Sequence, residues 1–325
     1  METVRVARQA MATRFEIVLH GDSPVSLRAA GEEALEEIDR IEARLSLYRP
    51  SSEISLVNAH AAREPVRVSP ATFRLIEHAA RLSAETDGAF DVTVGPLMRC
   101  WGFMGGPGQL PSPEAVDEAR GRVGMHLLKL DPKEFTIGFA RDGVMLDLGA
   151  IGKGYAVGVA GEILREAGVT SALVHGGTSS IFALGHPPDA DAWKVAIDRP
   201  QVGPEKPGLS RAPDGAQGIL AVVPLRDEAL SVSAVSGKSF RSADEIFGHV
   251  IDPRTGEPSS RAMLAAVSLA STTETDALST ALLTLGPPGL ERIAALRAPM
   301  RLLVAGMRGD EFVVEGRGID VEVRK

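Results

Sequence analysis

The residues best suited to chemistry are a carboxylate and a lysine around a glycine-rich stretch in the middle of the chain. Asp147 ends an apolar run, glycines follow at 149, 152 and 154, and Lys153 stands among them. Glycines at the start of a helix let backbone N–H groups approach an anion, and the helix dipole favours negative charge there. The stretch is therefore a candidate phosphate site, although its spacing fits neither the P-loop nor the dinucleotide fingerprint. A tight turn between a strand and a helix explains the same glycines equally well.

A second pair of oxygen-bearing residues lies late in the chain. Asp276 and Thr280 are four residues apart, so on a helix their side chains share one face and could hold a hard cation. Mg²⁺ needs only one protein carboxylate and a few neutral oxygens when substrate phosphates complete its shell. Taken alone, the pair is explained better by an acidic residue near a helix N-terminus and a threonine bonded to its own helix.

Residues 249–258 are predicted to form a strand that enters a polar turn, with Gly256 supplying a positive φ. His249 could act as a general base or bind a phosphate, although a lone histidine is more often structural. Two turns of small residues, 174–179 and 231–238, follow predicted strands and could approach a planar ligand. The sequence contains no Gly-x-Ser-x-Gly nucleophile motif and no HExxH zinc motif.

The composition excludes several classes of function. The chain has 325 residues, of which 44% are hydrophobic and 24% charged, as in an ordinary globular protein. A formal net charge of −8 argues against binding to nucleic acid or to an anionic membrane. Cys100 is the single cysteine, so neither a disulfide framework nor a thiolate metal cluster can form. No segment resembles a signal peptide or a membrane span, and we expect a cytoplasmic protein.

Several helices and many short strands are predicted to position these residues. Helices are predicted over 27–45, from Ser69 toward Gly88, over 155–164 with a stop at Gly168, and from Ser271 to Gly286. Strands are predicted at 14–20, 127–131, 134–140, 143–147, 170–175, 179–184, 193–197, 218–224, 229–233, 245–251, 263–270, 300–305 and 310–314. Because strands outnumber helices and do not alternate regularly with them, the pattern favours an α+β fold over a doubly wound sheet. Prolines among glycines and charges predict an exposed loop at 200–217.

Taken together and in order, these motifs resemble the ApbE family, the FAD:protein FMN transferases. The resemblance covers most of the chain, and any one segment would be weak on its own, whereas the collinear order is specific. It overrides the simpler explanations given above for Lys153, Asp276 and Thr280. The segments that carry it are 11–15, 48–54, 90–97 with 101–103, 147–156, 176–177, 236–237, 249–256 and 275–280.

The resemblance implies a single α+β unit of the ApbE, T-fold-like kind over residues 1–325, with mixed and antiparallel sheets, packed helices and a central flavin cleft. It implies an enzyme that uses Mg²⁺ to transfer FMN from FAD to a Thr or Ser hydroxyl of an acceptor flavoprotein, releasing AMP. The family's FAD contacts fall on Met11, Tyr48, Ala89, Phe90, Asp91, Asp147, Lys153 and Val250. Its metal site falls on the Ala150 carbonyl with Asp276 and Thr280.

In such a reaction charge builds on the phosphate oxygens and on the departing AMP, where Mg²⁺ held by Asp276 and the Lys153 ammonium would stabilise it. A base is needed for the attacking hydroxyl, and our candidates are His249 or a metal-held carboxylate. Tyr48 would supply a flat partner for a ring system.

Three positions depart from the family's usual pattern. Ala12 stands where glycine is usual, Thr178 where an acidic residue is usual, and Val235 where threonine is usual. They leave two alternatives open: an FAD pyrophosphatase that forms FMN and AMP, and a protein that binds FAD without catalysis.

Overall fold

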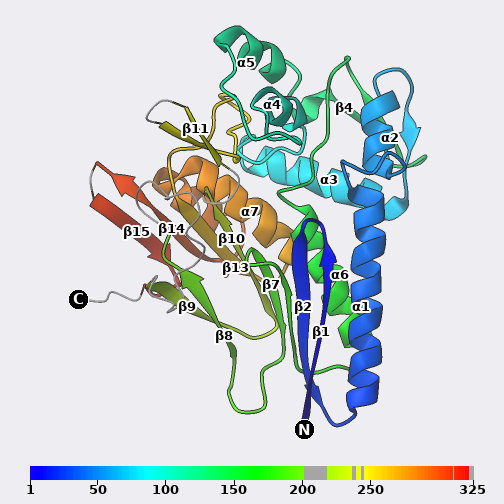
Figure 1. Ribbon diagram of the computed structural model, residues 1–325, viewed down its shortest axis with the longest axis vertical. Coiled ribbons are helices and arrows are strands. Elements are labelled where there is room, and N and C mark those ends of the chain that lie inside the picture. The colour runs from blue at the N-terminus through cyan, green and yellow to red at the C-terminus, as the bar shows by residue number, and fades with distance from the viewer. Residues whose placement is uncertain (201–217, 236–238, 243–244, 310, 322–325) are drawn as a thin grey trace.

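An eight-stranded antiparallel sheet forms the centre of the computed structural model, which describes residues 1–200, 218–235, 239–242, 245–309 and 311–321 (Figure 1). The strand order is β1-β2-β6-β7-β10-β13-β14-β15. These strands are β1 (Glu2–Ala10), β2 (Thr13–Gly21), β6 (Ala172–Gly176), β7 (Ser180–Leu184), β10 (Glu228–Ala234), β13 (Leu264–Leu269), β14 (Arg301–Arg308) and β15 (Glu311–Arg317). The loop predicted at 200–217 lies, except for Pro200, outside the described residues.

Three smaller sheets accompany the central one. They are β3 (Val66–Arg67) with β5 (Thr136–Phe139) and β4 (Leu128–Asp131), the hairpin β8 (Trp193–Asp198) and β9 (Ile219–Leu225), and the hairpin β11 (Ser239–Ser242) and β12 (Glu245–Gly248). Eight α-helices lie in the described ranges: α1 (Pro24–Leu45), α2 (Glu53–His60), α3 (Pro70–Glu85), α4 (Gly95–Cys100), α5 (Pro113–Arg120), α6 (Gly152–Glu166), α7 (Thr272–Leu285) and α8 (Leu290–Ala294). Short 3-10 segments occur at Met125–Leu127 and Pro287–Gly289.

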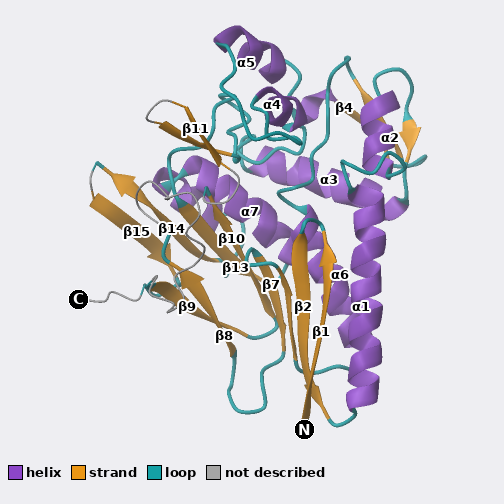
Figure 2. Ribbon diagram, viewed as in Figure 1, coloured by secondary structure: helices purple, strands orange, loops and turns teal. Residues whose placement is uncertain are grey.

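The central sheet buries both of its faces. Along β13, Ala265 and Val267 join the core that α1, α6 and α7 cover, whereas Leu264 and Ala266 face the hairpin of β8 and β9. This alternation follows from the two-residue period of a strand. Figure 2 shows the long helices grouped beside the strands, with α7 running along the sheet. The fold is α+β, as predicted.

Serine caps start most of the helices. α1, α2, α3, α5 and α7 each begin after a serine whose side-chain oxygen accepts a hydrogen bond from the N–H three residues later. A cap of this kind contributes about 0.5–2 kcal/mol to helix stability. The sequence predicted the caps at Ser69 and Ser271, and both are confirmed.

The prediction of a strand at 143–147 is wrong, because these residues form no strand in the structure. Within it only Met145 forms a bridge, to Val94, and Asp147 follows in an irregular segment. The Asp147 N–H instead donates to the Val92 carbonyl at 2.7 Å. Apolar side chains in this segment are buried against the core without a neighbouring ladder, so hydrophobicity alone was misleading here.

The sequence pattern does not predict β1, α4 or α5, and the strand that it predicts at 245–251 is too long. Pairing with β2 and burial of Val4 and Val6 stabilise β1, which pattern reading had left unassigned. α4 has only six residues and starts at Gly95-Pro96, so its sequence resembled a turn. β12 ends at Gly248, which leaves His249 beyond the strand.

The turn between β1 and β2 gives a stability prediction. Ala10 pairs with Thr13, so Met11 and Ala12 form a two-residue loop, and both have positive φ (48° and 57°). A residue with a Cβ is strained in this conformation, and glycine is preferred in such turns. We expect Ala12→Gly to raise the free energy of unfolding by about 0.5–1 kcal/mol, since relief of strain exceeds the added chain entropy.

Urea unfolding of Ala12→Gly and of Ala10→Gly would test this. In β1 the same change removes a buried methyl group from a strand, so Ala10→Gly should be destabilising. A loss of stability in both variants would contradict the assigned strain at Ala12.

Candidate active site

The start of α6 packs directly against α7. The Gly154 N–H donates to Asp276 Oδ2 at 2.8 Å. A Cβ on Gly154 would lie 2.6 Å from the Asp276 Cβ, and one on Gly158 would overlap the Thr272 hydroxyl. Gly154 and Gly158 are therefore needed for the close packing of α6 against α7. The same packing places Asp276 beside the N-terminus of α6.

Asp276 is a buried carboxylate without a cationic side-chain partner in the part of the chain that the structure describes. It is 4% exposed, and its second oxygen accepts a hydrogen bond from the Ser180 hydroxyl at 3.3 Å. The Thr280 hydroxyl lies one turn further on, where it donates to the Asp276 carbonyl and contacts the Ser233 hydroxyl, each at 3.2 Å. A buried negative charge with only two neutral donors is unfavourable unless a cation accompanies it.

These two side chains face a cavity of about 650 Å³. Ten of the twelve predicted site residues line it, namely Ala89, Phe90, Asp91, Asp147, Ala150, Lys153, His249, Val250, Asp276 and Thr280. They come from segments spread over almost two hundred residues of sequence. The structure thus brings together the phosphate-site, metal-site and base candidates in one place.

Tyr48 and Met11 do not line this cavity. Tyr48 is 70% exposed, and the negative charge of Asp147 adds to burial in raising the pKa of its phenol, which shows that the two lie within electrostatic reach. Met11 occupies the β1–β2 turn and packs against the main core. The prediction that both contact FAD gains no support from the walls of the cavity.

Asp147 lies at the centre of the charged part of the cavity. Burial raises the pKa of its carboxyl, while the Gly149 N–H (2.9 Å to Oδ1) and the nearby charges of Lys153 and His249 lower it. The Lys153 ammonium donates to the Gly149 carbonyl at 3.2 Å. An ammonium and an imidazole therefore both lie near one carboxylate at the start of α6.

Asp91 has a structural task in addition to lining the cavity. Its carboxylate accepts bonds from the Thr93 N–H and hydroxyl (2.7 and 2.6 Å), the Met125 N–H and the Ser83 hydroxyl. Burial raises the pKa of Asp91, and these hydrogen bonds oppose that rise. The aspartate fixes the turn that carries Ala89 and Phe90 to the cavity.

Sequence reasoning missed one wall of the cavity, formed by Met98 and by residues 197–200 at the end of β8. The guanidinium of Arg199 lies 4.6 Å from the centre of the Phe312 ring on β15. An Arg-Pro pair after a predicted strand was the only local signal. The two small-residue turns were better indicators, because Thr178, Ser179 and residues 232–234 also line the cavity.

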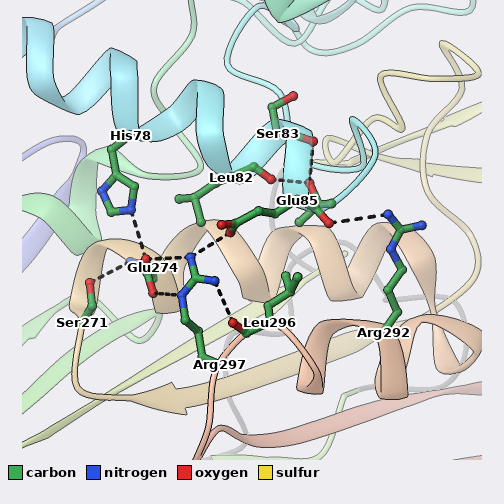
Figure 3. A network of polar contacts seen from close by, with 10 residues as sticks. His78, Leu82, Ser83, Glu85, Ser271, Glu274, Arg292, Leu296 and Arg297 are labelled. Carbon is green, nitrogen blue, oxygen red and sulfur yellow. Dashed lines mark hydrogen bonds and ion pairs between the residues drawn. The ribbon is translucent and has the colours of Figure 1, made fainter.

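A network of charges fixes the first turn of α7, two residues before Asp276 (Figure 3). Glu274 contacts His78 Nε2 from α3 at 3.1 Å and accepts two bonds from Arg297, at 3.0 and 3.1 Å. Arg297 also binds Glu85 at 2.7 Å. His78 therefore has a hydrogen-bonding partner on α7. These contacts tie α3, α7 and the segment after α8 together.

This network predicts a specific dependence of stability on pH. Hydrogen bonds from His78 and Arg297 lower the pKa of Glu274 to about 2, despite burial. Because this pKa is lower in the folded state than the ordinary value near 4.5, the stabilisation is complete above that value. It is lost as pH falls toward 2. We expect the free energy of unfolding of wild type to exceed that of Glu274→Gln by about 2–3 kcal/mol at pH 6. At pH 3 the difference should be much smaller.

Urea unfolding at several pH values would measure this difference. Glu291→Gln is a suitable control, since Glu291 is 77% exposed in its ion pair with Arg317 and should contribute little. A difference between wild type and Glu274→Gln that stays constant from pH 6 to pH 3 would contradict the assignment.

The described residues contain no group of three or more His, Cys, Asp or Glu side chains arranged to hold a metal. A cation at Asp276 would therefore rely on neutral oxygens such as those of Thr280 and Ala150, which suits Mg²⁺. No helix within the described ranges has the length and apolar character needed to cross a bilayer.

The fold and the site define a class: α+β proteins with a cavity where a glycine-rich helix start meets a second helix. Residues 11–303 match the ApbE family, and the chain belongs to this family. It is 30% identical over 295 residues to the FAD:protein FMN transferase of Haemophilus influenzae, covering 88% of this chain and 81% of that protein. The Escherichia coli K12 enzyme of the same name is 29% identical over 285 residues, covering 85% of this chain and 76% of that protein.

Solved structures agree. The ApbE protein of Thermotoga maritima superposes with a TM-score of 0.82 at 26% identity, covering 93% of this chain and 94% of that chain. The flavin transferase ApbE of Vibrio cholerae superposes with a TM-score of 0.81 at 27% identity, covering 98% of this chain and 97% of that chain.

Proposed function

We propose that this chain is a Mg²⁺-dependent FAD:protein FMN transferase that moves FMN from FAD to a Thr or Ser hydroxyl of an acceptor flavoprotein and releases AMP. The observation that carries the proposal is the shared cavity of Asp276, Thr280, Ala150 and Lys153 at the start of α6. The names of the relatives in the family support the same activity.

The reaction balances with the groups at hand. The acceptor hydroxyl oxygen forms a bond to the FMN phosphorus, the bond from that phosphorus to the bridging oxygen breaks, and this oxygen leaves with AMP. His249 takes the hydroxyl proton, and the Lys153 ammonium stabilises charge on the phosphate oxygens. Mg²⁺ bound by Asp276, Thr280 and the Ala150 carbonyl would neutralise the diphosphate and the departing AMP.

The departures from the family pattern bear unequally on this proposal. Ala12 lies in the β1–β2 turn, and Val235 packs against the main core, and neither lines the cavity. Thr178 does line it. Position 178 is therefore the place where the two alternatives, hydrolysis of FAD and binding without catalysis, would originate.

Incubation with FAD and Mg²⁺, with and without candidate acceptor proteins, tests the proposal. Transfer predicts AMP in equal amount to a covalent flavin mass on the acceptor, and none without acceptor. AMP and free FMN formed without acceptor would indicate a pyrophosphatase. Tight FAD binding with no AMP under any condition would indicate a binding protein.

A further inference from the structure

His249 reaches the cavity from a segment that is neither helix nor strand. β12 ends at Gly248, and His249 follows in a bend. It lines the cavity together with Asp147. Side-chain packing must therefore contribute to fixing its position.

The hairpin before His249 also needs outside support. Among the residues that the structure describes, β11 and β12 pair only with each other, and an isolated two-stranded hairpin is marginally stable. Phe240 and Phe247 stack across it with ring centres 5.2 Å apart. They pack on Trp101 and Phe103, which lie just beyond α4. The ring centres are 5.5 Å apart for Trp101 and Phe247 and 5.7 Å apart for Phe103 and Phe240. We call these four rings the aromatic cluster.

The cluster is anchored to the rest of the molecule at Trp101. Trp101 is 2% exposed, and its indole N–H donates to the Gly256 carbonyl at 2.8 Å. Gly108 lies directly against the Phe240 ring, since a Cβ on Gly108 would overlap that ring. The rings therefore connect the fixed end of α4 to the hairpin through buried contacts.

One ring of the cluster also meets the imidazole. Phe103 is 2% exposed, and its ring lies edge-on to His249, with 6.5 Å between ring centres and 71° between planes. Edge-to-face pairs at this separation are favourable and directional. Phe103 does not itself line the cavity, and its ring meets the site at the imidazole of His249.

We propose that Phe103 is a positioning residue, which holds the His249 imidazole in place at the cavity through an edge-to-face contact backed by the aromatic cluster. The placement of the ring stands on the structure alone, and its effect on catalysis rests on the proposed function. Small misplacements of a catalytic group are known to reduce rates strongly.

The test compares Phe103→Leu with Phe73→Leu. Phe73 is 1% exposed on α3 and forms a similar edge-to-face pair with Phe135, at 5.6 Å and 71°, outside the cavity walls. Protein labelled with ¹³C at histidine Cε1 gives one signal for each of the seven histidines. His249→Gln identifies the His249 signal. Phe103→Met, which nearly keeps the volume of the side chain, replaces Phe103→Leu if that variant does not fold.

We expect loss of the Phe103 ring to move the His249 signal more than any other histidine signal, because the ring current is lost, and Phe73→Leu to leave it in place. Transfer should fall about tenfold in kcat with little change in the KM for FAD. An unchanged His249 signal in folded Phe103 variants overturns the proposal, whatever the activity. If the signal moves but wild type transfers no FMN, the proposed function fails and the positioning of the imidazole is supported.

Discussion

Asp276→Asn should reduce FMN transfer by about 10³-fold or more while leaving the protein folded. The asparagine has nearly the same shape, and its carbonyl oxygen can still accept the Gly154 N–H bond now made at 2.8 Å. What disappears is the negative charge, and neither Thr280 nor the Ala150 carbonyl can replace it in binding a divalent ion. The measurement is AMP release and acceptor mass at increasing Mg²⁺ concentration.

Ser180→Ala is the matched control for this change. It removes the donor to the other oxygen of Asp276 (3.3 Å) and keeps the carboxylate charge. We expect a modest loss, from an unpaired lone pair, that higher Mg²⁺ partly restores. Equal activity in wild type and Asp276→Asn would refute the metal assignment.

Gly154→Ala should both destabilise the protein and impair its activity. In an open helix the change would stabilise, since glycine is unfavourable in helices. Here the new methyl group would meet the Thr272 carbonyl and lie 2.6 Å from the Asp276 Cβ, so α6 and α7 must move apart. We expect the free energy of unfolding to fall by about 1–3 kcal/mol. Transfer should fall as well, because Asp276 would shift relative to Ala150.

Gly152→Ala separates this packing effect from helix propensity. The nearest atom to a Cβ on Gly152 is the Leu148 Cβ at 4.0 Å, so the same substitution two residues earlier meets no obstacle. Its unfolding free energy should stay equal to that of wild type or rise. Gly154→Ala as stable as Gly152→Ala would show that the two helices have room between them, and would contradict the packing described here.

Local signals predicted the elements around the site well. Serine caps and apolar spacing located α3 and α7, and the glycine stop at 168 marked the end of α6, where Gly168 has a φ of 78°. These features act within a few residues, so a linear sequence displays them. The six-residue α4 was missed for the same reason, because too few residues repeat for a period to appear.

The site itself was predicted by a different route. Asp276 and Thr280 alone were better explained as ordinary helix residues, and indeed Thr280 does bond back to the Asp276 carbonyl. Only the collinear resemblance to a family favoured a metal role. Tyr48 is 70% exposed and lies outside the cavity walls, and its contact with FAD stays a prediction.

The sequence by itself determined the α+β class, the capped helices, the glycine-rich start of α6 and the family. Only the tertiary structure decided that Gly154 donates to Asp276 across 122 positions and that Phe103 meets His249. The physical reason is that periodicity, capping and turn chemistry act between near neighbours in the chain. Contacts between distant segments depend on strand order and on how closely helices pack, and single residues do not encode these.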